Sequence, residues 1–175
     1  MKLQMIFLLV FLSSVTTAKA SGVYQTPETF LQESFRGKVP KSRMIWLSGE
    51  TGKVASDILQ HRPGSLRTRY WLDKNRSAWV LDEIGKDKPI TVGVVINDGK
   101  IESIRVLVFR ESRGYEVKES FFTEQFKQAR LKADKELDRH IDGITGATLS
   151  VRALTRLSRL ALYLHQQVMV SHDAP

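Results

Sequence analysis

The hydrophobic period changes from strand-like to helical between residues 109 and 149, and this change constrains the fold most. Four strand-like segments come first, in two pairs: Leu66–Leu72, Ala78–Leu81, Pro89–Ile96 and Lys100–Phe109. Asp98 and Gly99, within the second pair, suit the positive φ angles of a tight hairpin turn. Leu149–Val168 instead repeats its aliphatic side chains every three or four positions, as a helix with one buried face does. The sequence therefore predicts an α+β fold, a mainly antiparallel twisted sheet with packed helices.

Shorter helices are predicted on both sides of the strands. Pro27–Phe35 and Gly52–Gln60 precede them, with the basic loop Arg36–Arg43 in between, and Phe121–Arg130 follows them. A length of 175 residues fits one domain. The predicted organisation is a signal peptide over residues 1–20, an N-terminal helical and loop segment over 21–65, one domain over 66–170 and a tail over 171–175.

The first 20 residues are predicted to be a secretory signal rather than part of the fold. Lys2 gives a basic start, Ile6–Leu12 is an unbroken apolar run, and small residues at 18 and 20 fit signal peptidase cleavage after Ala20. The apolar run is far shorter than the ~20 residues that span a bilayer. A retained membrane anchor is the alternative. The predicted location is periplasmic.

The composition excludes several kinds of chemistry. There is no cysteine, so disulfides, thiolate zinc sites, Cys-ligated iron–sulfur clusters and c-type haem attachment are ruled out. Any redox chemistry must therefore come from a cofactor held by other residues. The net charge is +8, but the basic residues are scattered and nucleic acid is not a predicted partner. The histidines lack metal-ligand spacing and are expected at the surface: His61, His140, His165 and His172.

The segment Asp142–Thr148, with the sequence Asp-Gly-Ile-Thr-Gly-Ala-Thr, is the candidate site. Gly143 and Gly146 allow a close approach of backbone to ligand, and Thr145 and Thr148 supply hydroxyl groups. The helix that follows offers free N–H groups and the positive end of its dipole, which favour a phosphate. From the residues alone two interpretations remain open, a phosphate site and an ordinary helix cap after a glycine loop.

This segment resembles the flavinylation motif Asp-x-x-Ser/Thr-Gly-Ala-Thr/Ser of the FMN-binding domain family. The family includes the FMN-carrying periplasmic subunits of sodium-pumping NADH:quinone oxidoreductase and Rnf-type complexes, and many small exported flavoproteins. Two further stretches are similar to the small exported members, Arg110–Val117 and the region from Arg69 to Thr91. The resemblance covers about Leu66–Gln166.

The resemblance implies a function and a site. In the family the last Thr or Ser of the motif carries FMN through a phosphoester, which corresponds to Thr148. A separate flavin transferase forms that bond from FAD, releases AMP, and recognises the positions of Asp142 and Gly146. The implied protein is an electron-transfer flavoprotein rather than a stand-alone enzyme, with a membrane-bound oxidoreductase or a cytochrome as its partner. The other implied cofactor-binding residues are Gly143, Thr145, Ala147, Leu149, Glu111, Gly114 and Tyr115.

Other roles and functions remain open at this point. Tyr70, Trp71 and Trp79 are candidates to stack on a flavin, with core packing as the alternative. Arg110 and Arg113 are candidates to stabilise an anionic flavin, with a solvated loop as the alternative. The alternative functions are a non-redox exported module that binds an anion in the same loop, and a cofactor-free accessory subunit of a membrane oxidoreductase.

Overall fold

A five-stranded antiparallel sheet forms the centre of the computed structural model, which describes residues 22–173. The predicted signal peptide lies outside the described residues. The strands lie side by side in chain order: β1 (Arg43–Trp46), β2 (Arg67–Asp73), β3 (Arg76–Ile84), β4 (Pro89–Asn97) and β5 (Lys100–Phe109). Tight turns join β2 to β3, β3 to β4 and β4 to β5. The predicted α+β class and all four predicted strands are confirmed.

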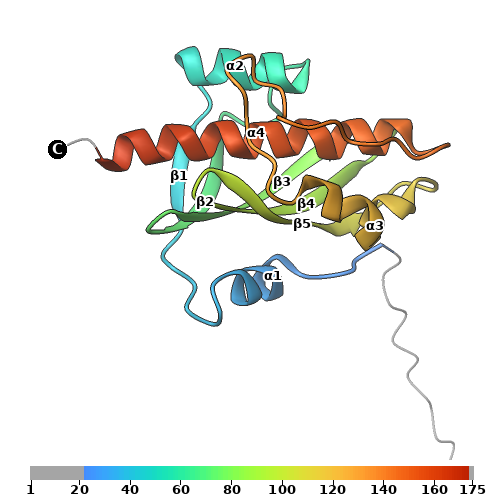
Figure 1. The fold of residues 1–175 in the computed structure, drawn as a ribbon, viewed down its shortest axis with the longest axis horizontal. Helices are drawn as coiled ribbons and strands as arrows, with labels where there is room; N and C mark the ends of the chain where they lie inside the picture. The colour runs from blue at the N-terminus through green and yellow to red at the C-terminus, as the bar shows by residue number, and fades with distance from the viewer. Residues whose placement is uncertain (1–21, 174–175) are drawn as a thin grey trace, which may run out of the picture.

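Helices cover both faces of the sheet (Figure 1). The long helix α4 (Thr148–Asp173) lies across one face against β3, β4 and β5, and α2 (Gly49–Leu59) packs on its outer side. The short helix α1 (Pro27–Ser34) packs on the opposite face against β3 and β4. The larger hydrophobic core lies between α4 and the sheet, and a smaller one lies under α1. Within residues 22–173 no helix combines the length and apolar character needed to cross a membrane.

Strand β1 lies within the segment predicted to contain only helices and loops. Its four residues pair with β2, from Arg43 opposite Tyr70 to Trp46 opposite Arg67. Three of the four are exposed and the other is half-buried, so the strand shows no alternation of apolar and polar residues. A run this short and this open to solvent carries little strand signal, because period-2 burial is what makes strands recognisable.

The prediction of one helix over Phe121–Arg130 is wrong. Only α3 (Ser120–Thr123) and a 3-10 turn (Glu124–Phe126) form there, after another 3-10 turn at Tyr115–Lys118. The rings of Phe122 and Phe126 meet edge to face at 5.5 Å, and both are fully buried. The chain then leaves the helical path because Gln128 N donates to Ile101 O and Ile101 N donates to Ala129 O. Bonding to β5 thus replaces further helical turns.

His165 is buried, contrary to the expectation of a surface position. It is 3% exposed, and its Nδ1 lies 2.8 Å from Ser77 Oγ, which accepts a hydrogen bond from Trp79 Nε1 at 2.8 Å. Burial lowers the pKa of His165 to about 4, so the imidazole is neutral at physiological pH. The helical repeat shows why: His165 follows Ala161 by four residues and precedes Val168 by three, which places it on the buried stripe of α4.

We expect Gly93→Ala to destabilise the protein by about 1–3 kcal/mol, because it overpacks the smaller core. A Cβ at this position of β4 would lie 2.7 Å from the ring of Phe30, which is 1% exposed and has no room to swing away. Urea denaturation measures the loss. Gly64→Ala is the control, because nothing lies within 4 Å of its added Cβ. Equal stability of the two variants would contradict this account of how α1 packs.

Candidate functional site

The candidate motif forms a tight turn that leads directly into α4. Ala147 N donates to Ile144 O at 2.9 Å, and Gly146 occupies the third position of this turn with φ of 83°. That angle is typical of type II turns, in which glycine is the preferred residue at the third position. Val151 N then donates to Ala147 O at 2.9 Å, which makes Ala147 the N-cap and Thr148 the first helical residue.

The start of α4 presents unpaired donors and a hydroxyl group. An alanine N-cap has no side-chain oxygen to accept from the first N–H groups of the helix, and these groups carry the positive end of the helix dipole. Thr148 is exposed, and within the described residues its hydroxyl makes no hydrogen bond. Its position after the N-cap excludes the ordinary cap interpretation of this threonine. What remains is an accessible hydroxyl beside donors suited to a phosphate.

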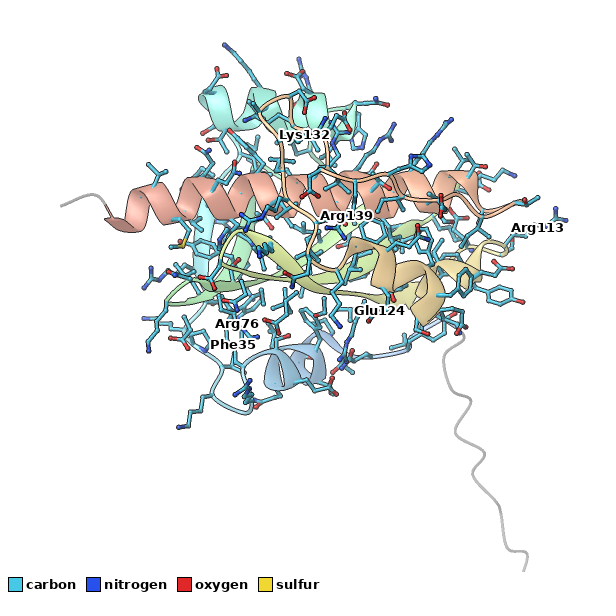
Figure 2. All side chains as sticks on the ribbon, viewed as in Figure 1. Phe35, Arg76, Arg113, Glu124, Lys132 and Arg139 are labelled. Atoms are coloured by element: carbon cyan, nitrogen blue, oxygen red, sulfur yellow. The ribbon has the colours of Figure 1, made fainter. Side chains whose placement is uncertain are left out.

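The loop before the first 3-10 turn packs against the start of α4. Gly114 is buried with φ of 82°, and a Cβ there would lie 2.8 Å from Ser150 Oγ and 3.3 Å from Ala147 Cβ. The predicted site residues Gly114 and Ala147 are therefore brought together. Ser150 was not predicted, because no local pattern marks a helix serine as the neighbour of a distant glycine. Figure 2 shows Arg113 extending away from the molecule at the end where α4 begins.

Glu111 holds the turn between β3 and β4. Its Oε1 accepts from the backbone N–H groups of Lys86, Asp87 and Lys88 at 2.5, 2.7 and 2.9 Å. Burial alone would raise the pKa of Glu111, but these three donors and the Lys86 charge outweigh it and hold the pKa below its usual value. The carboxylate is therefore ionised and already bonded, so the structure gives this side chain a role in supporting the loop. Contact of Glu111 with a flavin stays a prediction.

Arg110 has a similar supporting role. Its guanidinium donates to Pro89 O and to Thr91 Oγ1, both at 3.0 Å, and so fastens the loop to β4. Together with Glu111 it fixes the strand before Gly114 relative to the sheet. The Arg110 guanidinium is thus already hydrogen-bonded within the protein. Arg113, in contrast, is exposed to solvent.

The other predicted motif residues lie open to solvent on the outer side of the turn. Asp142 is exposed, its N–H donates to Gln125 Oε1 at 2.7 Å, and its carboxylate lies 3.7 Å from His140 Nε2. Within the described residues, only adjacent residues lie within 4 Å of a Cβ built on Gly143 or Gly146. Thr145 is exposed as well. These four residues are therefore accessible to a macromolecule, whereas Ala147 is buried.

Two apolar side chains near the turn are also exposed. Tyr115, next to Gly114, is 53% exposed, and Leu149, next to Thr148, is 42% exposed. Gly114 lies against Ala147 and Ser150, the residues just before Thr148 and just after Leu149, so both exposed side chains belong to the start of α4. An aromatic ligand would cover apolar surface here that the protein leaves in water.

The aromatic residues of β2 and β3 belong to the cores. Tyr70 and Trp79 stack at 5.2 Å between ring centroids and are 8% and 0% exposed. Trp71 is half-buried and packs against the smaller core. The core-packing alternative is therefore the one that the structure supports for all three.

A cleft of about 550 Å³ runs along the outer face of α4. Arg152, Thr155 and Arg159 line it at spacings of four, seven and eleven residues from Thr148, so they share the helical face that carries Thr148. Arg159 donates a hydrogen bond to Lys135 O and forms an ion pair with Glu136. Arg152 is exposed, one turn beyond Thr148, and forms no ion pair within residues 22–173. It is a cation near the motif that was not predicted.

A buried carboxylate lies next to Arg156, one of the residues that line this cleft. Glu83 is 4% exposed, its Oε1 lies 2.8 Å from His61 Nε2 and 3.6 Å from Arg156, and Arg156 also donates to Gln60 Oε1. His61 Nδ1 lies 2.8 Å from Arg62 O, so both ring nitrogens face acceptors. The Glu83 carboxylate, followed by the Arg62 carbonyl, raises the pKa of His61 above 6.5.

We expect this pair to make stability depend on pH. A raised pKa in the folded state means that the contribution of His61 is complete below about pH 6.5 and is lost as the pH rises through the folded value. The His61 side chain is 44% exposed, so solvent screening limits the effect to at most about 1 kcal/mol. Urea denaturation of the wild type and His61→Gln across this range measures it. A difference between the two proteins that does not change with pH would contradict the prediction.

The fold is an α+β domain, and the start of α4 combines free N–H donors, an exposed hydroxyl and exposed apolar side chains. Residues 85–163 match the family model described as FMN-binding domain. This part of the chain is therefore similar to FMN-binding domains, and the match indicates a flavin-binding protein. The matched range includes the Glu111–Tyr115 loop, the motif and most of α4. Neither a curated protein nor a solved structure matches the chain.

Proposed function

We propose that this protein is an exported electron carrier with FMN joined to Thr148 through a phosphoester. The bound flavin would supply one- and two-electron redox chemistry that the side chains of this chain lack. In this proposal a flavin transferase loads the protein, a membrane reductase delivers electrons, and a periplasmic or respiratory partner receives them. Export rests on the signal-like residues 1–20.

The main support for the proposal is the position of the Thr148 hydroxyl. It is accessible at the first position of α4, and the N-cap before it, Ala147, has no side-chain oxygen. In the loading reaction the Thr148 oxygen loses its proton and bonds to the FMN phosphorus of FAD, while the pyrophosphate bond breaks and AMP leaves. The phosphate then lies beside the first N–H groups of the helix, which suit an anion.

The surrounding residues fit such a group. The turn is open around Gly143 and Gly146, so within the described residues no distant side chain occupies the space in which the phosphate would lie. Gly114 closes the other side of the helix start, with the exposed faces of Tyr115 and Leu149 near it. In this proposal these side chains lie against the ring or ribityl chain, and Arg152 or Arg113 balances its negative charge.

The mass spectrum of the denatured protein tests the proposal. The full-length chain is produced with a flavin transferase and exported, and then unfolded. The expected result is a mass increased by FMN less one water, flavin fluorescence that persists after unfolding, and an N-terminus at Ser21. A protein that releases all its flavin on unfolding would overturn the covalent link while leaving flavin binding intact.

A further inference from the structure

One part of the sheet surface is left uncovered on the side of α1. With eight residues α1 is about 12 Å long, too short to cover five strands, and it lies over β3 and β4. Met44 and Trp46 of β1 are directly opposite Arg69 and Arg67 of β2, and opposite residues share a face of a sheet.

These side chains form an exposed cluster, which we name the β1 patch: Met44, Trp46, Arg67 and Arg69. Met44 is 43% exposed and Trp46 59%, high values for large apolar side chains. The Arg67 guanidinium lies 5.6 Å from the Trp46 ring centre in a cation–π arrangement.

The charge around the β1 patch is mainly positive, although the exposed Asp73 ends β2. The segments 36–47 and 66–72 contain no aspartate or glutamate. Their six cationic side chains are all exposed: Arg36, Lys38, Lys41, Arg43, Arg67 and Arg69. A second copy pairing along β1 would bring two such sets of cations together, which disfavours self-association through this edge.

We propose that the β1 patch docks the protein on the surface of an anionic phospholipid bilayer. Tryptophan has an apolar body and an N–H group and prefers the region between headgroups and hydrocarbon. Arginine and lysine extend apolar stems with charged ends that reach anionic headgroups. Exposed apolar side chains next to several cations match this layered chemistry.

The β1 patch and the candidate flavin site lie at opposite ends of α4. Figure 1 shows β1 near the end of the molecule where α4 finishes, whereas Thr148 begins α4 at the other end. The 26 residues of α4 span about 39 Å. A flavin on Thr148, which rests on the proposed function, would then lie far from the docked patch.

Vesicle binding of the protein without flavin tests the proposal, so the result is independent of the proposed covalent link. The probes are vesicles of phosphatidylcholine with about a third phosphatidylglycerol, and vesicles of phosphatidylcholine alone. We expect co-sedimentation and a blue shift of Trp46 fluorescence with the anionic vesicles only, both lost at high salt. Trp46→Ala should remove the shift, because the buried Trp79 and the packed Trp71 do not move.

Matched variants separate the β1 patch from net charge. Arg67→Gln with Arg69→Gln should weaken vesicle binding about 25-fold, at about fivefold for each cation. Lys53→Gln with Lys86→Gln removes the same charge elsewhere, from side chains 78% and 74% exposed, and should change binding little. Equal losses in the two double variants would overturn the proposal, as would absence of binding to anionic vesicles, which would leave an acidic protein as the occupant. Dimerisation that Met44→Lys abolishes would assign the edge to a second copy instead.

Discussion

Thr148→Ala, produced with a flavin transferase that modifies the wild type, is expected to carry no covalent flavin. The variant lacks the only atom through which the proposed phosphoester forms, so the loss should be complete. Alanine is the best helix former, and the Thr148 hydroxyl makes no hydrogen bond within the described residues, so the fold should not change. Mass spectrometry and in-gel flavin fluorescence of the denatured protein measure the loss, and circular dichroism checks the fold.

Two further variants make this result specific to one hydroxyl. Thr148→Ser keeps the nucleophile and agrees with the family pattern, so it should retain flavin. Thr155→Ala removes another α4 hydroxyl, which donates to Val151 O at 2.9 Å, and should also retain flavin. Covalent flavin on Thr148→Ala would refute the attachment point, although not flavin binding by the domain.

The sheet and α4 could be predicted from sequence because their signals are long and periodic. The β4–β5 hairpin has two extended apolar runs around Asp98-Gly99, and α4 repeats its aliphatic residues over most of its length. Strand β1 could not be predicted, because four mostly exposed residues have no inward and outward alternation. The segment after α3 follows its hydrogen bonds to Ile101, a distant residue that no local pattern indicates.

The candidate site divides in the same way. The motif and the helix that follows it are recognised from neighbouring residues alone. The structure accordingly has Thr148 at the helix start and Gly146 in the turn before it. The approach of Gly114 to Ser150 joins segments far apart in the chain and depends on how the loop after β5 is fastened by Arg110. Local propensity does not encode such contacts, because tertiary packing decides them.

The aromatic residues show the limit of residue type as a guide to function. Three tryptophans have the same chemistry in the sequence and three different environments in the fold. Trp79 is fully buried, Trp71 is half-buried beneath α1, and Trp46 is 59% exposed. Only the degree of burial distinguishes Trp79, which stabilises the core, from Trp46, which is available to a partner.

Trp79→Ala is expected to destabilise the protein by about 3–5 kcal/mol, because it leaves a cavity in the larger core where α4 packs on the sheet. The substitution also removes the ring stack on Tyr70 and the hydrogen bond from Trp79 Nε1 to Ser77 Oγ. Ser77 Oγ also contacts His165 Nδ1, so this buried polar group would lose one of its two partners. For a domain of this size the melting temperature should fall by about 10 °C. Trp46→Ala removes the same side chain from an exposed strand and should change stability by less than about 0.5 kcal/mol. Thermal and urea denaturation of both variants measure the loss of stability. Similar losses for the two variants would contradict the role in the core that the burial of Trp79 indicates.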